Sequence, residues 1–515
     1  MISQSALLAF ILTSLVLVRY YYQGWVLKRK LATIPSCAGN GVFSSFTDPF
    51  RPLFDPLAFI QEGYDKFRGS VFKFQVLSRW VVIVTSPALI QDLQKAPDDV
   101  VSSQEGVKEL LQSEYTFGNP FHEDPYTVKV IRGLLTRNIG AKFAEVQDEI
   151  TVSCEELLPS TGEWELVNLR DVIMPLVART SNRFFSGLPL CRNPDYLDLN
   201  IRYTLQVILS AYFISVFPAF LKPLIGNVFT PLRSAMRRAR RHLVPIIKER
   251  LANEERYGEE WSERPNDLLT WLLSEATTSS RRTVDDLVLR FLATNFGAIH
   301  TTTMTVTAAI SSLGVNPEYI PELRQEITSV VAEHGWTKAA MGHMRKLDSF
   351  LMESQRMYMY FAYGLNRKVL KDFTFLNGLT VPAGATVAVP VWAIHHDNAS
   401  TSSFHFILSF MTRNEYFPNA ETFDGFRFSK MREEEGESIK HQMVTPTREY
   451  LLFGVGRHAC PGRFFAVNEV KAIIGHMLME YDFKLEPEGV MPNVKWFGGG
   501  GMQDEKTKVW FRKRK

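Results

Sequence analysis

A single cysteine near the end of the chain stands in a loop that could ligate the iron of a flat macrocycle. Cys460 lies between Gly456 and Gly462 in the segment Phe453-Gly-Val-Gly-Arg-His-Ala-Cys-Pro-Gly462. Glycines let the main chain approach such a ring closely and leave N–H groups free to point at the sulfur. A thiolate in this position would push electron density onto haem iron and favour cleavage of an O–O bond. The alternative is a buried free cysteine, which is common for this residue type.

Two basic side chains just before the cysteine could bind the carboxylate of a haem propionate. Arg457 and His458 stand three and two residues before Cys460. The segment resembles the haem-binding loop of the cytochrome P-450 family, F-x-x-G-x-R-x-C-x-G. The residues that match this pattern are Phe453, Gly456, Cys460 and Gly462. The family has arginine where this chain has His458, so the propionate partner stays open between His458 and Arg457.

A glutamate and an arginine lie on a segment that predicts a helix from Leu347 to Tyr360. The spacing of Glu353 and Arg356 puts both charges on one helical face, which by itself is equally typical of a solvated pair. With Arg427, which follows Pro418-Asn-Ala-Glu-Thr-Phe423, they resemble the E-x-x-R and P-x-x-x-x-F…R-F motifs of the same family. The resemblance implies that Glu353, Arg356 and Arg427 form a buried structural triad behind the haem, because three buried charges must satisfy one another.

A third segment predicts the helix on the oxygen-binding side of the haem. Thr283-Val-Asp-Asp286 is typical of a capping box, and Asn316-Pro317 should end the helix. The stretch Gly297-Ala-Ile-His-Thr-Thr-Thr303 resembles the family pattern A/G-G-x-D/E-T-T. Thr301 matches the family threonine, and the resemblance implies that its hydroxyl hydrogen-bonds dioxygen at the iron. His300 replaces the family acid; it could relay protons near neutral pH, or it could point at a neighbouring helix.

Arg132 and an aromatic stretch complete the set of expected haem and substrate contacts. Arg132 in Val128-Lys-Val-Ile-Arg132 resembles the arginine of the family motif W-x-x-x-R, with valine at the tryptophan position. The resemblance implies that Arg132 binds a haem propionate; the alternative is an exposed arginine on a helix. The stretch from Tyr358 to Leu365 corresponds to a family segment that borders haem and substrate. Its aromatic composition suits a large apolar ligand, although most of these side chains are typical of a core.

The composition excludes several classes of function. With 58 Lys and Arg against 55 Asp and Glu, the net charge of +3 gives no basis for nucleic-acid binding. The four cysteines show no paired spacing, which is typical of a reducing compartment and predicts neither disulfides nor a zinc site. The resemblance covers most of the chain and implies one large catalytic domain with the cytochrome P-450 fold, mainly α with small β-sheets. Gly378–Gly384 predicts a hairpin, followed by a strand from Val387 to Val391.

The N-terminal segment predicts a transmembrane helix. Residues Ala6–Val18 are apolar, aromatic residues follow, and Lys28-Arg29-Lys30 closes the segment, which reaches the roughly 20 residues of a span if the aromatic group is counted. Basic residues at its end predict that the rest of the chain is cytosolic. We therefore expect an anchor in the endoplasmic reticulum membrane at 1–30, a proline-containing hinge at 31–56 and the catalytic domain at 57–515. A cleaved signal peptide is the weaker alternative, because a charged n-region and a cleavage site are missing.

A second stretch could also contact a membrane. Tyr212–Ile225 is apolar and interrupted by Pro218 and Pro223, and a predicted helix rich in arginine follows it. The arginines are Arg233, Arg237, Arg238, Arg240 and Arg241. One interpretation is a lipid-facing substrate entrance with basic side chains at the headgroups. The other is a buried core segment followed by a solvated helix.

Residues Ala399–Asn414 lengthen a loop that is short in the family. Removing them would join Asn398 to Glu415 and restore a family-like length. We hypothesise that residues 399–414 are translated from a retained intron. A true insertion, such as a loop that touches the membrane, is the alternative.

Together these features predict a membrane-anchored haem-thiolate monooxygenase with haem b ligated by Cys460. Such an enzyme would take electrons from an NADPH-cytochrome reductase and insert one atom of dioxygen into a C–H bond of a hydrophobic small molecule. The motifs resemble those of fungal microsomal members that oxidise terpenoids and other secondary metabolites, which is a family analogy. Two alternatives stay open: a haem-thiolate isomerase or peroxygenase, and a non-functional product if residues 399–414 prevent folding.

Overall fold

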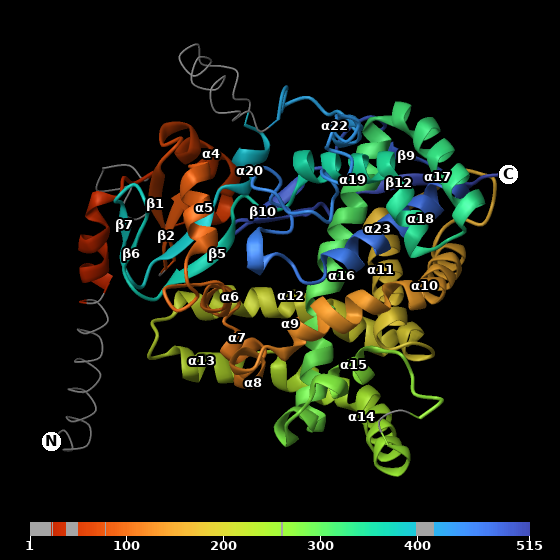
Figure 1. Cartoon of the computed structure of the whole chain (residues 1–515), viewed down its shortest axis with the longest axis horizontal. Helices are drawn as coiled ribbons and strands as arrows, with labels where there is room; N and C mark the ends of the chain where they lie inside the picture. The colour runs from red at the N-terminus through yellow and green to blue at the C-terminus, as the bar shows by residue number, and fades with distance from the viewer. Residues whose placement is uncertain (1–21, 23, 38–49, 78, 259–260, 398–416) are drawn as a thin grey trace.

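The helix that the sequence predicts from Thr283 onward runs through the middle of the molecule (Figure 1). The computed structural model describes residues 22, 24–37, 50–77, 79–258, 261–397 and 417–515. In it α16 (Val284–Val315) has 32 residues, and the Thr283 side chain accepts a hydrogen bond from the N–H of Asp286. Asn316 is the C-terminal cap and Pro317 follows. The capping box and the proline therefore set both ends of α16 as predicted.

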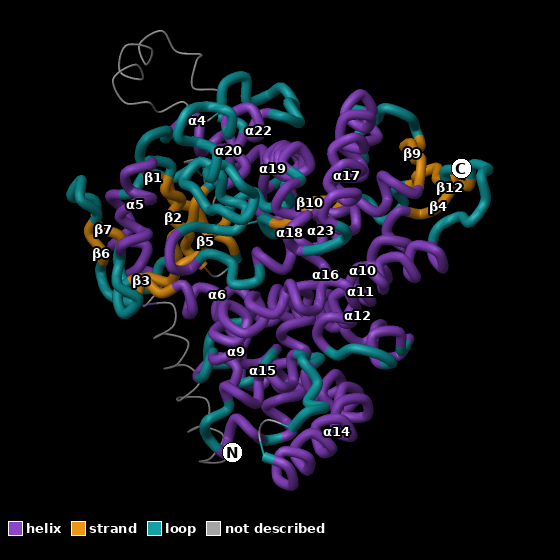
Figure 2. The backbone as a smooth tube through the Cα atoms, turned by 45° about the vertical axis from the view of Figure 1, so that its right-hand side comes forward, coloured by secondary structure: helices purple, strands orange, loops and turns teal. Residues whose placement is uncertain are grey.

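Long helices surround α16 and make most of the molecule helical (Figure 2). The helices α11, α12, α14, α19 and α23 pack directly against it. The longer helices are α10 (Thr136–Leu157), α11 (Leu169–Phe185), α12 (Pro194–Val216), α13 (Lys222–Phe229), α14 (Leu232–Tyr257), α15 (Leu268–Glu275), α17 (Ile320–His334), α19 (Arg345–Tyr358) and α23 (Arg463–Glu480). The helix predicted over 347–360 is thus α19, shifted by two residues at each end, because the chain becomes extended at Met359.

Shorter helices and turns connect the long ones. They are α3 (Arg51–Phe54), α4 (Pro56–Lys66), α5 (Pro87–Lys95), α6 (Ser103–Leu111), α7 (Ser113–Thr116), α8 (Asn119–Glu123), α9 (Tyr126–Val130), α18 (Lys338–His343), α20 (Val391–His395) and α22 (Arg427–Met431). The turns η1 (Leu31–Thr33), η3 (Leu190–Arg192), η4 (Ser279–Arg282), η5 (Pro317–Tyr319) and η7 (Gly456–His458) are 3₁₀-helical. The turn η2 (Ile131–Leu135) is π-helical and joins α9 to α10 without a break.

The largest sheet of the described residues has the strand order β1-β2-β8-β5-β3 and lies on the side of the molecule away from α14 (Figure 1). Its strands are β1 (Val71–Val76), β2 (Arg79–Val84), β3 (Val101–Ser102), β5 (Gly364–Val369) and β8 (Thr386–Val389). The pair β2–β8 is parallel, with Val81 opposite Thr386, and the other pairs are antiparallel. The predicted strand 387–391 is β8; it ends at Val389 because Pro390 lacks the N–H that a ladder needs.

The remaining strands form small sheets. They are β4 (Glu165–Asn168), β6 (Phe373–Thr374), β7 (Thr380–Val381), β9 (Tyr481–Glu486), β10 (Val494–Phe497), β11 (Gly500–Gln503) and β12 (Lys508–Lys513). Strand β12 lies between β4 and β9, and β10 pairs with β11. The hairpin predicted over 378–384 is formed by β6 and β7 and begins earlier, with Phe373 opposite Val381.

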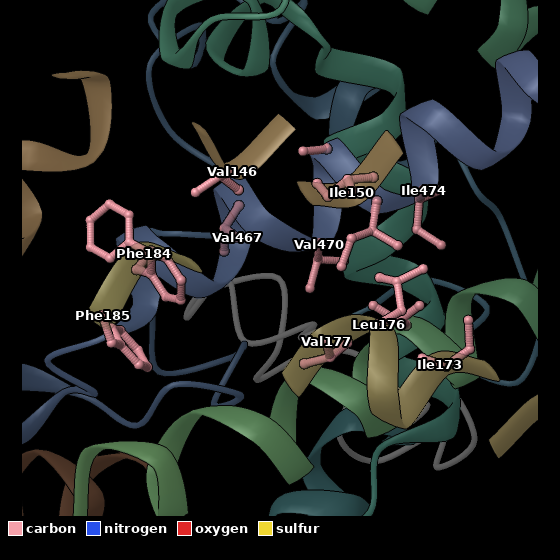
Figure 3. Close-up of a cluster of buried hydrophobic side chains, with 14 of the residues drawn as sticks. Val146, Ile150, Ile173, Leu176, Val177, Phe184, Phe185, Val467, Val470 and Ile474 are labelled. Atoms are coloured by element: carbon pink, nitrogen blue, oxygen red, sulfur yellow. The ribbon is translucent and has the colours of Figure 1, made fainter. Parts of the chain in front are cut away.

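The largest apolar core lies where α10, α11 and α23 meet (Figure 3). Ile173, Leu176 and Val177 of α11 recur at helical spacing and are buried. Val470 and Ile474 of α23 face them and are also buried. This spacing puts the apolar side chains on one stripe of each helix, so that packing the stripes together removes them from water. The core therefore fixes α23, the helix that follows Cys460, against the rest of the helical body.

The mainly helical architecture with small sheets agrees with the predicted fold class. Among the described residues no helix combines the length and the apolar character that crossing a membrane requires. The anchor predicted at 1–30 lies largely outside the described residues, and the 399–414 segment lies wholly outside them. Leu31 and Ile34, which begin the predicted hinge, are buried against the larger sheet. This part of the hinge therefore belongs to the folded body.

Candidate functional site

The loop that carries Cys460 is closed by a main-chain hydrogen bond and shaped by glycines. The N–H of Cys460 donates to the carbonyl of Phe453 at 2.8 Å. Gly454 and Gly456 have φ angles of 71° and 64°, a region that glycine enters without steric cost. Helix α23 begins at Arg463, just after the cysteine. The folded loop therefore holds the sulfur at the N-terminal end of α23.

The surroundings of the sulfur favour a negative charge only in part. The main-chain N–H groups of Gly462 and Arg463 lower the pKa of the Cys460 thiol, and the N-terminus of a helix favours an anion. Burial nevertheless raises the pKa of the Cys460 thiol, against the lowering effect of these N–H groups and of Arg463 and Arg132. A metal ion bound at the sulfur would remove the proton outright. The groups that would stabilise a metal-bound thiolate therefore already surround the thiol of Cys460.

Three of the cationic residues predicted from the sequence lie together beside this loop. Arg132 donates from Nη2 to the carbonyl of Arg457 at 2.7 Å, so η2 is tied directly to the cysteine loop. The side chains of Arg457 and His458 both contact Oδ1 of Asp98, at 3.2 and 2.8 Å. Burial lowers the pKa of His458 although Asp98 raises it. The structure thus brings Arg132, Arg457 and His458 together, with Asp98 engaging the two candidate propionate partners.

A fourth cation near the site was missed in the sequence. Arg367 of β5 is buried and donates to the carbonyl of Leu93. Burial, together with the nearby charge of Arg457, lowers the pKa of Arg367 to about 10. Its burial could have been predicted from its position in the strand. Arg367 lies two residues from both Leu365 and Val369, so its side chain points to the same face as these two apolar side chains. A buried arginine close to the other cations adds to the positive potential that would hold propionates.

The middle of α16 has one open face, and this face carries the small residue and the threonine that the sequence singled out. Gly297 and Thr301 are exposed and Thr305 is partly exposed, in a helix that is otherwise largely buried. Residues four apart share one side of a helix. A Cβ placed on Gly297 would meet no atom within 4 Å. This open strip on a helix that packs against α23 fits a flat macrocycle bound through Cys460.

Thr301 and His300 point in different directions. The Thr301 hydroxyl lies on the open face and donates to the carbonyl of Gly297 at 2.8 Å. His300 is buried, and its Nε2 lies 2.8 Å from the carbonyl oxygen of Ile201 on α12. Burial lowers the pKa of His300 despite this bond. The position of His300 thus corresponds to the second interpretation of the sequence, a side chain held by a neighbouring helix, and not to a relay beside Thr301.

The two arginines and the glutamate predicted to lie behind the haem are in contact. Both oxygens of Glu353 accept hydrogen bonds from Arg356, each at 2.8 Å. Arg427 donates from Nε to the same carboxylate at 3.1 and 3.2 Å. Glu353 and Arg356 are completely buried, and Arg356 also donates to the carbonyl of His395 at 2.6 Å. The three charges satisfy one another and link α19 to α20 and α22.

The aromatic stretch after α19 divides between core and open space. Tyr360 and Tyr363 are buried, whereas 43% of the Phe361 surface is exposed. Thr307 of α16 lowers the pKa of Tyr360 against the effect of burial, so the two side chains are neighbours, and Phe361 forms a β-bridge with Gly500. The stretch therefore runs from α16 to the larger sheet, as expected for a wall of a ligand channel.

These observations fit a haem held between α16 and the cysteine loop. Cys460 would supply the iron ligand and Arg132, Arg457, His458 and Arg367 the charges for two propionates. Thr301 offers a hydroxyl and Gly297 offers room on the opposite side. With haem bound, a thiolate ligand would supply the chemistry that activates dioxygen.

The chain matches a known family over nearly its whole length. The family model described as Cytochrome P450 matches residues 54–400 and 401–511. The break between the two matched segments lies inside the 399–414 segment that the sequence set apart.

Several curated fungal proteins are similar to this chain. Cytochrome P450 monooxygenase 103 of Postia placenta is 39% identical over 496 residues, 95% of this chain and 96% of that protein. Cytochrome P450 monooxygenase olcJ of Penicillium canescens is 33% identical and covers 89% of this chain and 84% of its own length. Cytochrome P450 monooxygenase CYP512U6 of Ganoderma lucidum is 30% identical, with 90% and 88% covered.

Proposed function

This chain belongs to the cytochrome P450 family, and on that premise we propose that it is a membrane-anchored monooxygenase that oxidises a hydrophobic small molecule, a terpenoid or another fungal secondary metabolite. Members of this family bind haem through a cysteine thiolate and use dioxygen, a substrate and a redox partner. We assign the thiolate to Cys460 and the redox partner to an NADPH-cytochrome reductase. The match to fungal monooxygenases over most of the chain supports the reaction type.

One arrangement carries the proposal: a cysteine at the N-terminal end of α23, in a loop tied to a cationic cluster, next to a helix with an open strip. Haem bound there supplies the redox chemistry that activates dioxygen. The N–H groups of Gly462 and Arg463 lower the pKa of the Cys460 thiol and so favour its thiolate form. Arg132 holds the loop through its bond to the Arg457 carbonyl. The chain thus fixes the position of the ligand before any substrate arrives.

On the other side, the chain must deliver protons and exclude bulk water. Thr301 is the hydroxyl that faces the open strip, and the proton that it donates to the Gly297 carbonyl could be donated to dioxygen instead. His300 instead stabilises the contact between α16 and α12 through the Ile201 carbonyl. We therefore propose Thr301 as the residue that holds the proton for the reaction, and we give His300 a structural role.

Exposed apolar side chains support membrane association. They gather on α12 and α13, beside each other in Figure 1, and are Leu209, Phe213, Val216, Leu224, Val228 and Phe229. This exposure does not fit the interpretation of 212–225 as a buried segment. Of the arginines that follow, Arg238 and Arg240 form ion pairs with acidic side chains. A lipid surface would cover the apolar patch, with the predicted anchor holding the catalytic body on the cytosolic side of the endoplasmic reticulum membrane.

The absorption spectrum of the reduced, carbon-monoxide-bound protein tests this proposal. We expect a strongly red-shifted Soret band in the wild-type protein and its loss in Cys460→Ser, with Cys154→Ser, which changes a buried cysteine, as a control. Substrate turnover should then require both NADPH with a reductase and dioxygen. A red-shifted band that persists in Cys460→Ser would refute the assignment of the ligand. Turnover with peroxide or with no oxidant at all would favour a peroxygenase or an isomerase.

A further inference from the structure

A cavity of about 300 Å³ lies between α10, the C-terminal end of α23 and the start of β9. This volume is at the lower end of the range for small-molecule sites. Side chains that line the cavity include Gln147, Glu155, Trp336, His476, Glu480 and Lys513. In Figure 1, β9 and β12 lie on the opposite side of the molecule from α13. The cavity is therefore separate from the Cys460 loop, at the other end of α23, and from the exposed apolar side chains of α12 and α13.

The wall of the cavity contains polar atoms that the described residues leave unsatisfied. Gln147 is only 8% exposed, and its Oε1 is buried without a hydrogen-bond partner in the described part of the chain. Its Nε2 lies 3.4 Å from Nδ1 of His476, which is also 8% exposed. An imidazole that accepts at Nδ1 carries its proton on Nε2, and no described residue bonds to that Nε2. One ligand hydroxyl could accept from Nε2 of His476 and donate to Oε1 of Gln147, which would remove the cost of leaving both unsatisfied.

The charged groups of the cavity give it an excess of negative charge. Glu155 and Glu480 line it, and neither forms an ion pair with another described residue. Burial lowers the pKa of His476, whereas the charges of Glu480 and Glu155 raise it and that of Lys513 lowers it. Burial also raises the pKa of the Tyr481 phenol, and both carboxylates raise it further. With the imidazole neutral, two carboxylates thus stand against one ammonium group, so a cation would be attracted to the cavity.

The indole ring of Trp336 supplies an aromatic side to the cavity. Its centroid lies 6.3 Å from that of the His476 ring, with 55° between the two planes. The ring packs against α23 at Gly475, where a Cβ would lie only 3.2 Å from the indole. The absence of a side chain at Gly475 therefore lets the indole approach the helix. An aromatic face beside carboxylates suits a cation with methyl groups on its nitrogen, because such an ion is drawn to the face of the ring.

We propose that this cavity binds a small quaternary ammonium ion that carries a hydroxyl group. The carboxylates of Glu155 and Glu480 and the face of Trp336 would hold the ammonium group. The hydroxyl would bridge His476 and Gln147. An organic cation fits better than a metal ion, because within the described ranges no three His, Cys, Asp or Glu side chains stand close enough to bind a metal. This site lies outside the haem site and adds a ligand that the monooxygenase reaction does not require.

The test compares choline with 3,3-dimethylbutan-1-ol, which has the same shape and hydroxyl group but no charge. Isothermal titration calorimetry of the haem-loaded protein at low salt gives each dissociation constant. We expect a dissociation constant of about 1 mM or lower for choline and one about 10-fold higher for the uncharged alcohol. The double variant Glu155→Gln, Glu480→Gln should reduce this ratio to about 1 and leave the affinity for the alcohol unchanged. Glu163→Gln, which changes an exposed glutamate outside the cavity, should leave the ratio unchanged.

Two further variants test the sign of the effect. Lys513→Gln should strengthen choline binding about threefold, because it removes a positive charge that opposes the ligand; a loss of affinity would contradict the electrostatic reasoning. Trp336→Leu should weaken choline binding about fivefold, more than it weakens binding of the alcohol, because the aromatic face attracts only the cation. Thermal unfolding of each variant shows whether it is folded. If the double variant does not fold, these two variants decide the outcome.

The haem spectrum and lipid vesicles show where the ligand binds and from which source it comes. Choline should leave the Soret band unchanged, whereas a shift with the same dissociation constant would place choline in the haem pocket and overturn the proposal. Equal affinities for choline and the alcohol in the wild-type protein, or an unchanged ratio in the double variant, also overturn it. Phosphatidylcholine vesicles should not displace choline from a site for the free ion. Displacement that the double variant abolishes would assign the same site to the lipid headgroup.

Discussion

Replacing Glu353 by glutamine should destabilise the protein by about 3–5 kcal/mol, the cost of breaking a buried ion pair from one side. The carboxylate is completely buried and accepts two bonds from Arg356 at 2.8 Å and two from Arg427 at 3.1 and 3.2 Å. It also accepts the N–H of Asp424 at 3.0 Å. The amide keeps the volume but removes the charge and turns one acceptor into a donor that faces a guanidinium. Because two arginines lose their partner at once, we expect the upper end of this range.

Urea unfolding followed by tryptophan fluorescence measures the change, with the haem-thiolate spectrum recorded at each step. The matched control is Glu62→Gln, which removes an exposed ion pair of similar length, with Arg51 at 2.7 Å. Exposed pairs contribute less than about 1 kcal/mol, so this variant should unfold near the wild-type midpoint. If Glu353→Gln and Glu62→Gln unfold at the same urea concentration, burial does not make this carboxylate costly to remove, and the reasoning is refuted.

Further expectations concern the proton path, the buried core and the loop. Thr301→Ala should keep NADPH oxidation but divert it to hydrogen peroxide, with product per NADPH falling about 10-fold or more; a product ratio equal to that of the wild-type protein would contradict this. His300→Gln can still donate to the Ile201 carbonyl, so turnover should stay within about threefold, whereas loss of a proton relay would cost about 100-fold. Burial raises the pKa of Glu469 to about 8 from a usual 4.5. The folded protein therefore binds more protons between these values, and its stability falls as the pH rises from about 4.5 to 8. Glu469→Gln should remove this slope and unfold at higher urea than the wild-type protein at pH 8; parallel pH profiles would count against it. Transcript sequencing should show an abundant message without the codons for residues 399–414 if they are a retained intron.

Features that depend on neighbouring residues could be predicted from the sequence. The Thr283 hydroxyl and the Asp286 N–H lie three residues apart, so the cap needs no knowledge of the fold. The same holds for the i, i+3 contact of Glu353 with Arg356. The end of β8 at Val389 could also have been predicted from the sequence, because Pro390 has no N–H to donate to a neighbouring strand. The glycines around Cys460 likewise predicted a tight loop, because glycine adopts positive φ angles without steric cost wherever it stands in the chain.

Contacts between distant segments that belong to no family motif escaped prediction, because no local pattern encodes them. Asp98 meets His458 across 360 positions of sequence, and nothing near Asp98 signals this. His300 depends on which helix lies beside α16, and its bond to Ile201 could be recognised only once α12 was in place. Arg79 is the first residue of a strand, and only the packed structure shows that its Nε is buried without a hydrogen-bond partner among the described residues.

The π-helical turn η2 contains Arg132, so the number of residues in this turn determines where a residue of the haem site points. A π turn holds one residue more than an α turn of the same height, and such turns frequently occur at functional sites. Here the additional residue falls at Ile131–Leu135, so the segments before and after it are rotated relative to each other around Arg132. Deleting a residue within this turn would restore an unbroken α-helix and swing Arg132 away from the Arg457 carbonyl. Sequence comparisons that tolerate a gap at this position would therefore overlook a change in the site even where every contacting side chain is retained.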